Sequence, residues 1–499
     1  MNNRREFLKG TAWMGMAAMA AGCIGAGRKI CDSAGAPMHG FTVPPMKKIR
    51  IGIIGVGGRG ISAVQRIAQI PGCEITAISD INPAMLDRAQ KWLVDHGYPK
   101  AKEWSRNGDE DAWKGLCDSD IVDVVYSVTP RPLHCPINVY GMDHGKHVLQ
   151  EVPGAFNLEE CWATVEAAER NRRHCMMLEN CTYGEAEMLA FNLIHKGKLG
   201  DIVQAEVGYT HDQRSLQYNP RDKRFWRLQR HMTQHGNYYP THGLVPAGRC
   251  LDINRGDRFD YLVAMESKSA GFEEFGRMNF PADDSATTLD GIKFNRHSAK
   301  MTKGDVTMCL MRTVNGRQIV LKHDVCNPCP YDRGSHYIGS RGIFRGITFP
   351  ETAADAYKMG SPCRFGWIDG PKGAVEDFFD FKKAMALREE YKHPFWKDAG
   401  EMSKKVGGHG GMDFIMDLRW AYCLQNGLPL DTDVYDLATY SSVVELSERS
   451  INNRSAAIDF PDYTRGGWKT AKPFTVDDID MSKFDFKNGV IHAKNAQKT

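Results

Sequence analysis

Short apolar runs and stretches with a helical hydrophobic period alternate along the chain from about residue 48 to residue 182. Apolar runs bounded by polar and glycine-containing turns are typical of buried strands, whereas apolar positions three to four residues apart indicate helices that cover a sheet. The predicted strands lie at 48–54, 74–79, 121–126, 147–150 and 175–178, and the predicted helices at 83–96, 137–144 and 158–172. This alternation predicts an α/β fold, with a Rossmann-type doubly wound parallel sheet over residues 48–182.

The pattern changes beyond Gly200. Strand-like runs at 202–209, 306–313 and 318–325 are separated by long polar segments. Strands that do not alternate regularly with helices favour antiparallel pairing. We therefore predict a C-terminal α+β substrate domain with a largely antiparallel open sheet over 183–472, and a C-terminal arm over 473–499 that lies on the surface.

A glycine-rich segment follows the first predicted strand directly and reads Gly55-Val56-Gly57-Gly58-Arg59-Gly60. Asp80 closes the second predicted strand, twenty residues beyond Gly60. The glycines allow a tight turn and a close approach of the backbone to a pyrophosphate, which the N–H groups of the next helix would face. A lone glycine motif is as often an ordinary turn, but strand, glycines, helix and acid in this register predict dinucleotide binding. Because the Asp80 carboxylate would accept from both ribose hydroxyls and repel a 2′-phosphate, NAD is favoured over NADP.

Ligands of open α/β sheets bind beyond the carboxyl ends of the strands. Three polar segments of this chain follow predicted strands, namely Thr129-Pro130-Arg131-Pro132-Leu133-His134, Glu151-Val152-Pro153 and Glu179-Asn180. We expect all three to line the cofactor crevice.

The first 30 residues carry a targeting pattern. The segment Asn3-Arg4-Arg5-Glu6-Phe7-Leu8-Lys9 resembles a twin-arginine export signal, and an uncharged stretch from Thr11 to Ala21 follows it. That stretch is too short to span a membrane, and a frayed N-terminal helix would not explain the paired arginines. We expect residues 1–30 to be read by the twin-arginine export machinery, which leaves the protein periplasmic or at the membrane surface. Cys23 is a candidate lipoprotein cleavage site, where an acyl chain would supply a lipid anchor.

The composition bounds the function. A chain of 499 residues with 42% apolar content is long enough for two sizeable domains, and a net charge of +3 with mixed signs argues against nucleic-acid binding. The basic and aromatic run from Arg221 to His231 is interpreted as a carbohydrate-facing or solvated strip. The 14 cysteines are scattered, so we expect mostly buried thiols, with two incidental cysteines in the loop Cys326-Asn327-Pro328-Cys329.

Three histidines, His231, His235 and His242, lie close together in the sequence. Histidines four residues apart on a helix chelate zinc, but Gly236-Asn237 breaks any helix here and no carboxylate is spaced to complete the set. We therefore expect no metal site.

The fingerprint, the turn from Thr129 to His134 and the strand Gly145-Lys146-His147-Val148-Leu149-Gln150-Glu151 resemble those of the Gfo/Idh/MocA superfamily of sugar-handling oxidoreductases. Members of that superfamily mostly carry Glu-Lys-Pro where this chain reads Glu151-Val152-Pro153, and their lysine commonly orders or polarises the hydroxyl that is oxidised. Val152 therefore lowers the expectation of a simple dehydrogenase.

A narrower resemblance extends over nearly the whole chain. The segment His235-Gly236-Asn237-Tyr238-Tyr239-Pro240-Thr241-His242-Gly243-Leu244 closely resembles the signature of glycoside hydrolase family 109, the NAD-dependent α-N-acetylgalactosaminidases. Further similar segments begin at Glu179, Lys322 and Gly407. The chain departs from that family at Val245-Pro246-Ala247 and in an insert-like stretch from Phe272 to Lys300, which leaves the exact sugar open.

The resemblance implies a hydrolysis that borrows a hydride. NAD⁺ would oxidise the carbon-3 hydroxyl to a ketone, the acidified carbon-2 proton would leave, the group on carbon 1 would be eliminated, water would add, and the hydride would return. Tightly bound NAD is then regenerated in each turnover, and no catalytic Asp/Glu pair is needed. The alternatives are an NAD-dependent periplasmic sugar dehydrogenase and a non-catalytic sugar- or cofactor-binding module. The α or β linkage, the aglycone and a homo-oligomeric state are left open.

The resemblance also assigns roles to individual residues. We expect His242 to be the acid/base group, with Tyr239 sharing the site; the alternative for His242 is a structural histidine that caps a loop. The implied substrate contacts are Tyr209, Arg227, Tyr239, Pro240, Thr241, His242 and Tyr331. The implied cofactor contacts are Gly55, Gly57, Gly58, Arg59, Gly60, Asp80, Arg131, Pro132, Leu133, His134, Glu151, Val152 and Asn180. The alternative for Arg131 is an ordinary surface charge, and Tyr183, His409 and Asp413 are further candidates.

Overall fold

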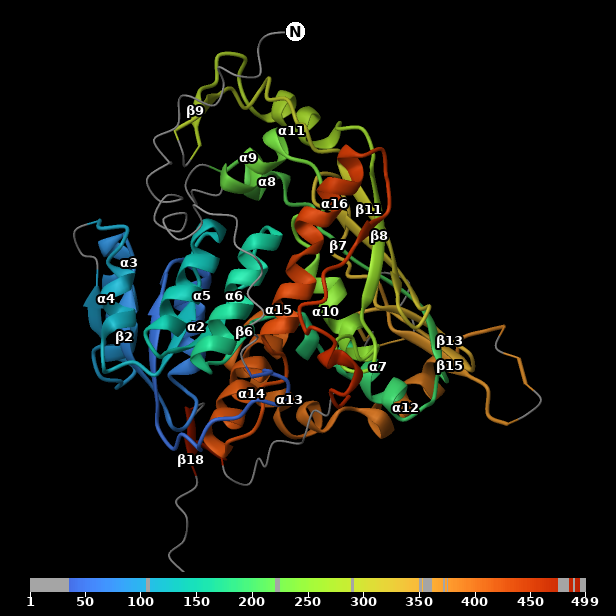
Figure 1. Ribbon diagram of the computed structural model, residues 1–499, viewed down its shortest axis with the longest axis horizontal. Coiled ribbons are helices and arrows are strands. Elements are labelled where there is room, and N and C mark those ends of the chain that lie inside the picture. The colour runs from blue at the N-terminus through green and yellow to red at the C-terminus, as the bar shows by residue number, and fades with distance from the viewer. Residues whose placement is uncertain are drawn as a thin grey trace, which may run out of the picture. The chain divides into compact units, whose positions relative to one another are not determined.

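The protein is described by a computed structural model, shown as a ribbon in Figure 1. The described residues are 36–104, 108–219, 225–288, 291–349, 352, 361–370, 373–374, 376–473, 484–487 and 490–493. The export signal predicted at 1–30, including Cys23, lies outside them.

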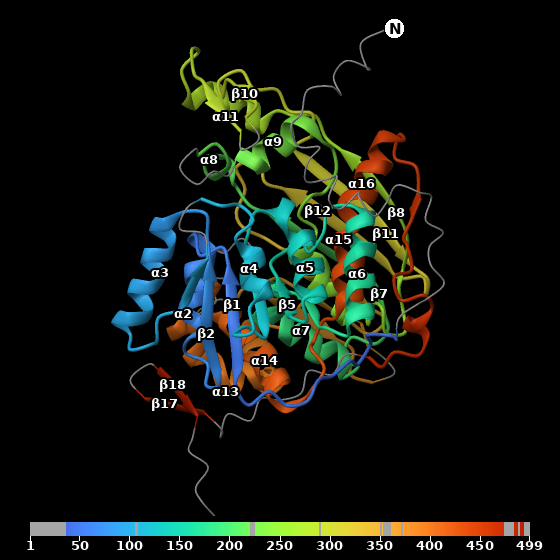
Figure 2. The ribbon, with the colours of Figure 1, turned by 60° about the vertical axis from the view of Figure 1, so that its left-hand side comes forward.

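The N-terminal sheet contains six parallel strands in the order β3-β2-β1-β4-β5-β6. This is the predicted doubly wound parallel sheet, seen in Figure 2. Its strands are β1 (Ile49–Ile54), β2 (Cys73–Ser79), β3 (Lys102–Trp104), β4 (Val124–Ser127), β5 (His147–Gln150) and β6 (Cys175–Met177). Strands β4, β5 and β6 are buried along their whole length, as expected where helices cover both faces of a sheet.

Helices connect these strands. They are α2 (Gly58–Ile67), α3 (Pro83–Asp95), α4 (Trp113–Asp118), the 3₁₀ turn η2 (Arg131–Leu133), α5 (His134–Asp143) and α6 (Leu158–Asn171). The side chains of Asn82 and Asn157 accept hydrogen bonds from the first turns of α3 and α6, which fixes where those helices begin.

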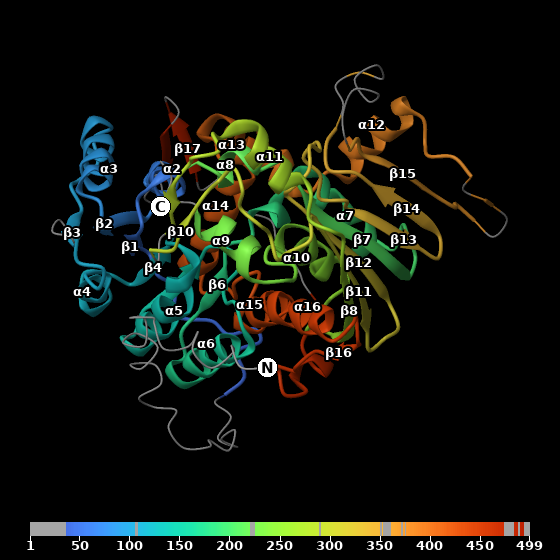
Figure 3. The same cartoon turned by 90° about the horizontal axis from the view of Figure 1, so that it is seen from above.

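The second sheet has eight strands in the order β15-β14-β13-β7-β12-β11-β8-β16, and only the β7–β12 pair is parallel. The predicted largely antiparallel sheet is confirmed (Figure 3). Its strands are β7 (Ile202–Thr210), β8 (Phe259–Glu266), β11 (Val306–Thr313), β12 (Gln318–Asp324), β13 (His336–Gly339), β14 (Gly342–Arg345), β15 (Arg364–Trp367) and β16 (Ile458–Asp459).

The segments around this sheet contain more helix than the sequence pattern predicts. They form η3 (Asn180–Tyr183), α7 (Glu185–His195), α8 (Arg214–Gln217), α9 (Phe225–Thr233), α10 (Thr241–Cys250), α11 (Gly271–Asn279), α12 (Phe381–Tyr391), α13 (Pro394–Val406), η6 (His409–Gly411), α14 (Met412–Asn426), α15 (Val434–Ser441), α16 (Val443–Asn452) and η7 (Gly467–Lys469).

Helix α14 belongs to the C-terminal part of the chain but packs against α2, β1 and η3. A hydrogen bond between two buried side chains holds it there. Arg66 Nε on α2 donates to Oδ2 of Asp417 on α14 at 2.7 Å. Tyr126 on β4 also donates to Asp417. The core is likewise continuous, since one apolar cluster contains residues of both predicted domains, such as Val148 and Leu244.

Two short hairpins complete the description. The insert-like stretch carries β9 (Ala286–Thr287) paired with β10 (Lys293–Phe294), and the predicted C-terminal arm contains β17 (Phe484–Lys487) paired with β18 (Val490–Ala493). Twelve cysteines lie in the described part of the chain; all are free thiols, and ten of them are buried. Within that part, no helix combines the length and the apolar character of a membrane span.

Candidate active site

The glycine-rich turn after β1 has the backbone shape of a phosphate cradle. Gly55 has φ of 85°, and a Cβ there would lie 2.6 Å from the carbonyl oxygen of Val128. A Cβ on Gly60 would lie 1.9 Å from the carbonyl oxygen of Gly55, so the turn cannot form with larger residues. Gly57 caps α2 without a side-chain hydrogen bond, and a Cβ there would meet no atom within 4 Å. The first N–H groups of α2 are therefore open to a diphosphate, and the site fits a dinucleotide.

The Asp80 carboxylate lies beside this turn. Its Oδ2 accepts from Val56 N at 2.9 Å, and its Oδ1 accepts from Asn82 N at 2.8 Å. These two bonds fix the carboxylate at the end of β2, where the fingerprint requires an acceptor for the ribose hydroxyls. Arg88 on α3, which the sequence did not single out, donates to the carbonyl oxygen of Gly57 at 2.8 Å and adds positive charge next to the turn.

Asp413 connects three of the predicted cofactor contacts. Its buried carboxylate accepts from Arg59 Nη1 and from Asn180 Nδ2, the latter at 2.6 Å, while Arg59 Nε donates to Glu151 at 2.7 Å. His409 Nδ1 lies 2.9 Å from Asp413 Oδ2. Burial opposes the charge on Asp413, but Arg59, His409 and Arg66 together outweigh it and lower the pKa of this carboxyl. The further candidates His409 and Asp413 therefore lie with the predicted cofactor residues.

His242 and Glu179 form a hydrogen-bonded pair. Nδ1 of His242, in the first turn of α10, lies 2.7 Å from Oε1 of Glu179, which follows β6 and is 2% exposed. Burial alone would raise the pKa of Glu179, but His242, with Thr241 and the N–H of Cys181, outweighs it and the pKa is lowered. With the carboxylate ionised, Nδ1–H of His242 donates to it, and in the neutral ring Nε2 then carries the lone pair. Nε2 has no hydrogen-bond partner among the described residues, so the pair has the form of a general base with an orienting carboxylate.

Aromatic rings surround His242. The ring centroids of Tyr239 and Tyr209 lie 4.8 and 5.1 Å from that of His242, and Tyr331 lies 5.8 Å from Tyr209. Pro240 precedes the first residue of α10, Thr241, and this helix start sets Tyr239 and His242 side by side. Burial raises the pKa of Tyr239 to about 12, which keeps its hydroxyl protonated as a donor. Tyrosine rings of this kind stack on the C–H faces of sugars, so the structure brings together most of the predicted substrate contacts.

Two of these tyrosines are held by residues that the sequence did not single out. Arg333 Nη1 donates to the Tyr331 hydroxyl at 2.9 Å, and its Nη2 lies 2.6 Å from Glu187, with both charged groups buried. Gln213 Nε2 donates to the Tyr209 hydroxyl at 2.7 Å. The Tyr209 hydroxyl also lies 3.2 Å from Nδ1 of His211, so these bonds fix the orientation of both tyrosines in the site.

The alternative that Arg131 is an ordinary surface charge is wrong. Its side chain is 3% exposed, and its Nη1 donates to the carbonyl oxygen of Tyr238 at 2.8 Å. The guanidinium lies 4.8 Å from the ring centroid of Tyr239, on the substrate side of the site. The sequence could not show this, because the rings that enclose Arg131 come from segments distant in the chain.

The remaining predicted cofactor residues of this region lie in two loops beyond β4 and β5. His134 Nδ1 lies 2.7 Å from the carbonyl oxygen of Pro153, and its Nε2 lies 3.0 Å from that of Thr129. Burial lowers the pKa of His134 to about 4, and a neutral ring has one N–H, so it donates to one of these two carbonyl oxygens. Pro132 is exposed, Leu133 is partly buried and Val152 is 7% exposed. Direct cofactor contact by this group stays a prediction.

Residues 49–179 match an oxidoreductase family with an NAD-binding Rossmann fold, and residues 183–470 match the C-terminal domain of glycosyl hydrolase 109. The chain belongs to glycosyl hydrolase family 109. A family member from Shewanella pealeana is 39% identical over 95% of this chain and 99% of its own length. One from Porphyromonas gingivalis is 41% identical over 87% of this chain and 88% of its own.

Solved structures share the fold at low identity. An NAD-binding oxidoreductase from Klebsiella pneumoniae has a TM-score of 0.60 at 16% identity over 83% of this chain and 99% of its own. Levoglucosan dehydrogenase in complex with NADH and levoglucosan has a TM-score of 0.57 at 17% identity over 83% of this chain and all of its own. The N-terminal part of this family 109 enzyme, which matches the NAD-binding oxidoreductase family, is an NAD(H)-binding domain.

The three histidines that are neighbours in the sequence do not converge. His231 Nε2 lies 2.9 Å from the Tyr238 hydroxyl, and His235 pairs with Glu266 instead. A different set, Glu179, Cys181 and His242, brings its ligand atoms within 4.8 Å of one another. Burial raises the pKa of the Cys181 thiol, and Glu179 already accepts from His242, so this arrangement is that of a hydrogen-bonded pair beside a protonated thiol.

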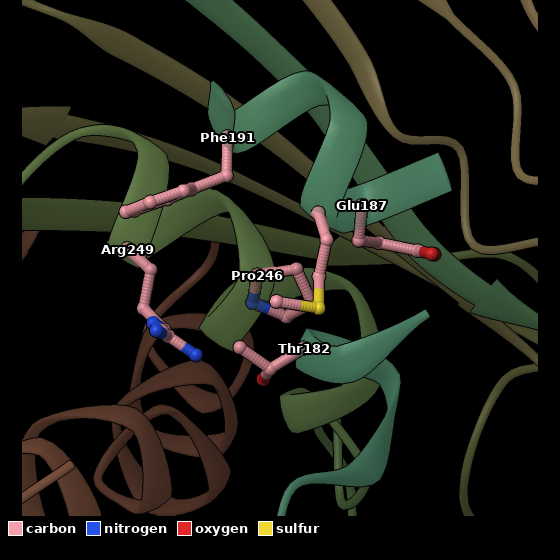
Figure 4. A pocket seen from close by; sticks show the side chains of 6 residues that line it. Thr182, Glu187, Phe191, Pro246 and Arg249 are labelled. Atoms are coloured by element: carbon pink, nitrogen blue, oxygen red, sulfur yellow. The ribbon is translucent and has the colours of Figure 1, made fainter. Parts of the chain in front are cut away.

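The candidate Tyr183 points away from this site, since its hydroxyl donates to Asp431 at 2.9 Å. A cavity of about 10 Å³ lies nearby; in Figure 4 it is lined by residues of η3 and α7 and by Pro246 and Arg249 of α10. That volume holds about one water molecule and no sugar. Thr182 Oγ1 and Glu187 Oε2 are buried and make no hydrogen bond within the described protein.

Proposed function

We propose that the protein is an exported glycosidase that removes terminal N-acetylgalactosamine, or a related hexosamine or hexose, with tightly bound NAD that is regenerated in each turnover. The observation that carries this proposal is the Glu179–His242 pair among the tyrosines. It joins a general base to a sugar-stacking surface just beyond β6 of the NAD-binding sheet.

Bound NAD⁺ would supply the reversible oxidation of the carbon-3 hydroxyl of the sugar. The residues of this chain handle the protons. His242 Nε2 would take the proton from carbon 2 as the bond from carbon 1 to the leaving oxygen breaks, and that oxygen would take a proton from water. The hydroxide left from that water would add to carbon 1, and His242, whose proton has exchanged with solvent, would return a proton to carbon 2. The Tyr239 hydroxyl, which stays protonated, would donate to the oxygen on carbon 3.

Two further observations support regeneration of the cofactor in place. Val152 stands where related dehydrogenases mostly carry a lysine that orders or polarises the hydroxyl to be oxidised. The chain lacks that lysine, which counts against an enzyme that releases an oxidised sugar. The twin-arginine pattern at Arg4-Arg5 would carry the protein across the membrane already folded, with its NAD acquired in the cytoplasm. An enzyme outside the cytoplasm has no pool of NAD to draw on, so it needs a cofactor that ends each cycle as it began.

The second candidate function is an NAD-dependent sugar dehydrogenase, and the shared fold with levoglucosan dehydrogenase favours it. The two functions differ in their products. A dehydrogenase would convert added NAD to free NADH, whereas the glycosidase would release a sugar with no change in nicotinamide absorbance.

The test is hydrolysis of chromogenic α- and β-glycosides by the purified protein without added cofactor, run in heavy water. We expect cleavage of one hexosaminide or hexoside, with deuterium at carbon 2 of the released sugar. The 3-O-methyl derivative of the same glycoside, which has no oxidisable hydroxyl, should stay intact. Cleavage without deuterium at carbon 2, or normal cleavage of the 3-O-methyl compound, would overturn the mechanism. Accumulation of free NADH would favour the dehydrogenase.

A further inference from the structure

Three arginines gather on the substrate side of the site. Arg131 comes from η2, and Arg227 and Arg230 lie on α9, seen in Figure 2. Aromatic rings join them. The guanidinium of Arg131 lies 4.6 Å from the ring centroid of Trp226, 4.8 Å from that of Tyr239 and 5.1 Å from that of Phe156. The guanidinium of Arg227 lies 5.0 Å from the Trp226 ring, and the guanidinium of Arg230 lies 4.9 Å from the Phe156 ring.

No carboxylate within the described ranges forms an ion pair with any of the three. The two acids that most influence Arg230 act from beyond ion-pair distance, and each also accepts a backbone N–H, Glu160 from Phe156 and Glu448 from His235. The described protein therefore compensates the positive charge of the arginine cluster only in part.

The cluster also has spare hydrogen-bond donors. Arg131 Nη2, Arg227 Nε and Arg230 Nε are buried and make no hydrogen bond among the described residues. The bonds that do form are few: Arg131 Nη1 to the backbone of Tyr238, and Arg227 Nη1 to Gln213 at 3.2 Å. Buried N–H groups without partners are rare in folded proteins, and a set of them with like charge is typical of a site that meets an anion.

The repulsion within the cluster shows in its electrostatics. Burial lowers the pKa of Arg131, and the neighbouring guanidinium of Arg227 lowers it further. Burial likewise lowers the pKa of Arg230. A guanidinium keeps its charge at neutral pH, so this unfavourable arrangement persists until an anion relieves it.

We propose that Arg131, Arg227 and Arg230 form a subsite for a negatively charged substituent on the glycoside, either a carboxylate or a sulfate ester. Planar guanidinium forks match both groups, and the cluster adjoins the sugar-stacking ring of Tyr239. This inference rests on the proposed function, because it takes the aromatic site to be the sugar site. Because the proposed oxidation needs a free hydroxyl on carbon 3, the charged substituent must lie at another position of the sugar.

The test is calorimetric binding to the NAD-loaded full-length protein, which needs no turnover. The probes are N-acetylgalactosamine, its 6-sulfate, galacturonic acid and inorganic sulfate. We expect at least one of the two anionic sugars to bind about 10- to 100-fold more tightly than the uncharged sugar, as charge-assisted hydrogen bonds provide. Added salt should weaken that binding and leave the uncharged sugar nearly unaffected. The two anionic sugars distinguish sulfate from carboxylate.

Arg131→Gln and Arg230→Gln should each remove most of this preference. Arg345→Gln, which changes an exposed arginine on β14, is the matched control and should preserve it. Arg230 is partly exposed, so its variant remains informative where Arg131→Gln fails to fold. Equal affinity for charged and uncharged sugars, a preference that survives both variants, or binding of inorganic sulfate alone would overturn the proposal. Anionic sugars that bind but are not cleaved as glycosides would sustain the subsite and count against the proposed hydrolysis.

Discussion

Oε1 of Glu179 lies 2.7 Å from Nδ1 of His242, although 63 residues separate the two in the chain. The ionised carboxylate selects the tautomer that leaves Nε2 free, and it would stabilise the imidazolium that forms when Nε2 takes a proton. Glu179 is therefore a positioning residue for the acid/base group, a role that the sequence had not assigned to it.

His242→Ala should reduce turnover by about 10²–10⁴-fold, since it removes the proposed acid/base group. Glu179→Gln should reduce turnover by up to about 10⁴-fold, the loss that follows replacement of the orienting carboxylate in the Ser-His-Asp triad. Both variants should still retain NAD. Steady-state rates on the cleaved glycoside and nucleotide analysis of the denatured protein check this.

Glu185→Gln is the matched control for Glu179→Gln. Glu185 pairs with Arg388 on α12, away from His242, so its replacement should leave the rate unchanged. A full rate in Glu179→Gln, or an equal loss in both glutamine variants, would contradict the positioning role.

Glu179 should also make folding stability depend on pH. Its folded-state pKa is lowered, so its pairing contributes stability at pH values above its unfolded pKa of about 4.3. That contribution is lost as the pH falls through the lowered folded pKa. Urea unfolding of the wild type and of Glu179→Gln should therefore differ most near neutral pH and converge in acid. A gap that stays constant down to the most acid pH tested would rule out this linkage.

Asp413→Asn should loosen the hold on NAD. The change removes one of the two carboxylates that hold Arg59 and leaves Glu151 as the other, and Asn180 loses its anionic acceptor. NAD should dissociate faster during dialysis, and stability should fall by about 3–5 kcal/mol, as when a buried ion pair loses one partner. Asp398→Asn, an exposed substitution on the adjoining α13, should change neither quantity. Undiminished retention in Asp413→Asn would show that the network serves folding alone.

Asp80→Ala should weaken NAD retention by about 1.5–3 kcal/mol, since charge-assisted bonds to the ribose would be lost.

Replacement of both Arg4 and Arg5 with lysine should strand the protein in the cytoplasm, because the twin-arginine machinery reads the arginine pair. Cell fractionation of the producing bacterium measures this, and labelling with palmitate tests an acyl anchor at Cys23. Export that continues unchanged, or that stops only when the general secretory route is blocked, would contradict twin-arginine targeting.

Local patterns in the sequence were sufficient to predict the N-terminal sheet and its cofactor turn. The predicted strand at 147–150 has the observed bounds, and the strand predicted at 121–126 begins later, at Val124. Asp123 explains that difference, because its carboxylate accepts from the side chain of Arg50 and the residues before β4 form a turn. Helices α12 to α16 were not predicted. In the pattern of hydrophobic and polar positions, taken without tertiary contacts, the polar faces of these helices resemble long loops.

The site was harder to predict because its bonds join distant segments. The sequence motif located His242 and Tyr239, but nothing local marks Glu187 as the partner of Arg333, 146 residues away, or Asp413 as the partner of Arg59, 354 residues away. Arg131 looks like a surface charge in a short turn, and only the rings packed around it show that it is buried. Such side chains are identified by packing, which no window of sequence contains.

The boundary between the two matched families falls between residues 179 and 183. Glu179 is the last residue of the NAD-binding match, whereas His242 belongs to the C-terminal match, and Arg59 and Asp413 are divided in the same way. Recombination that exchanged either half with that of a distant relative would have to supply the missing partner of both pairs. The two halves of this enzyme are thus bound to a shared evolutionary history, even though each resembles a module that could be transferred alone.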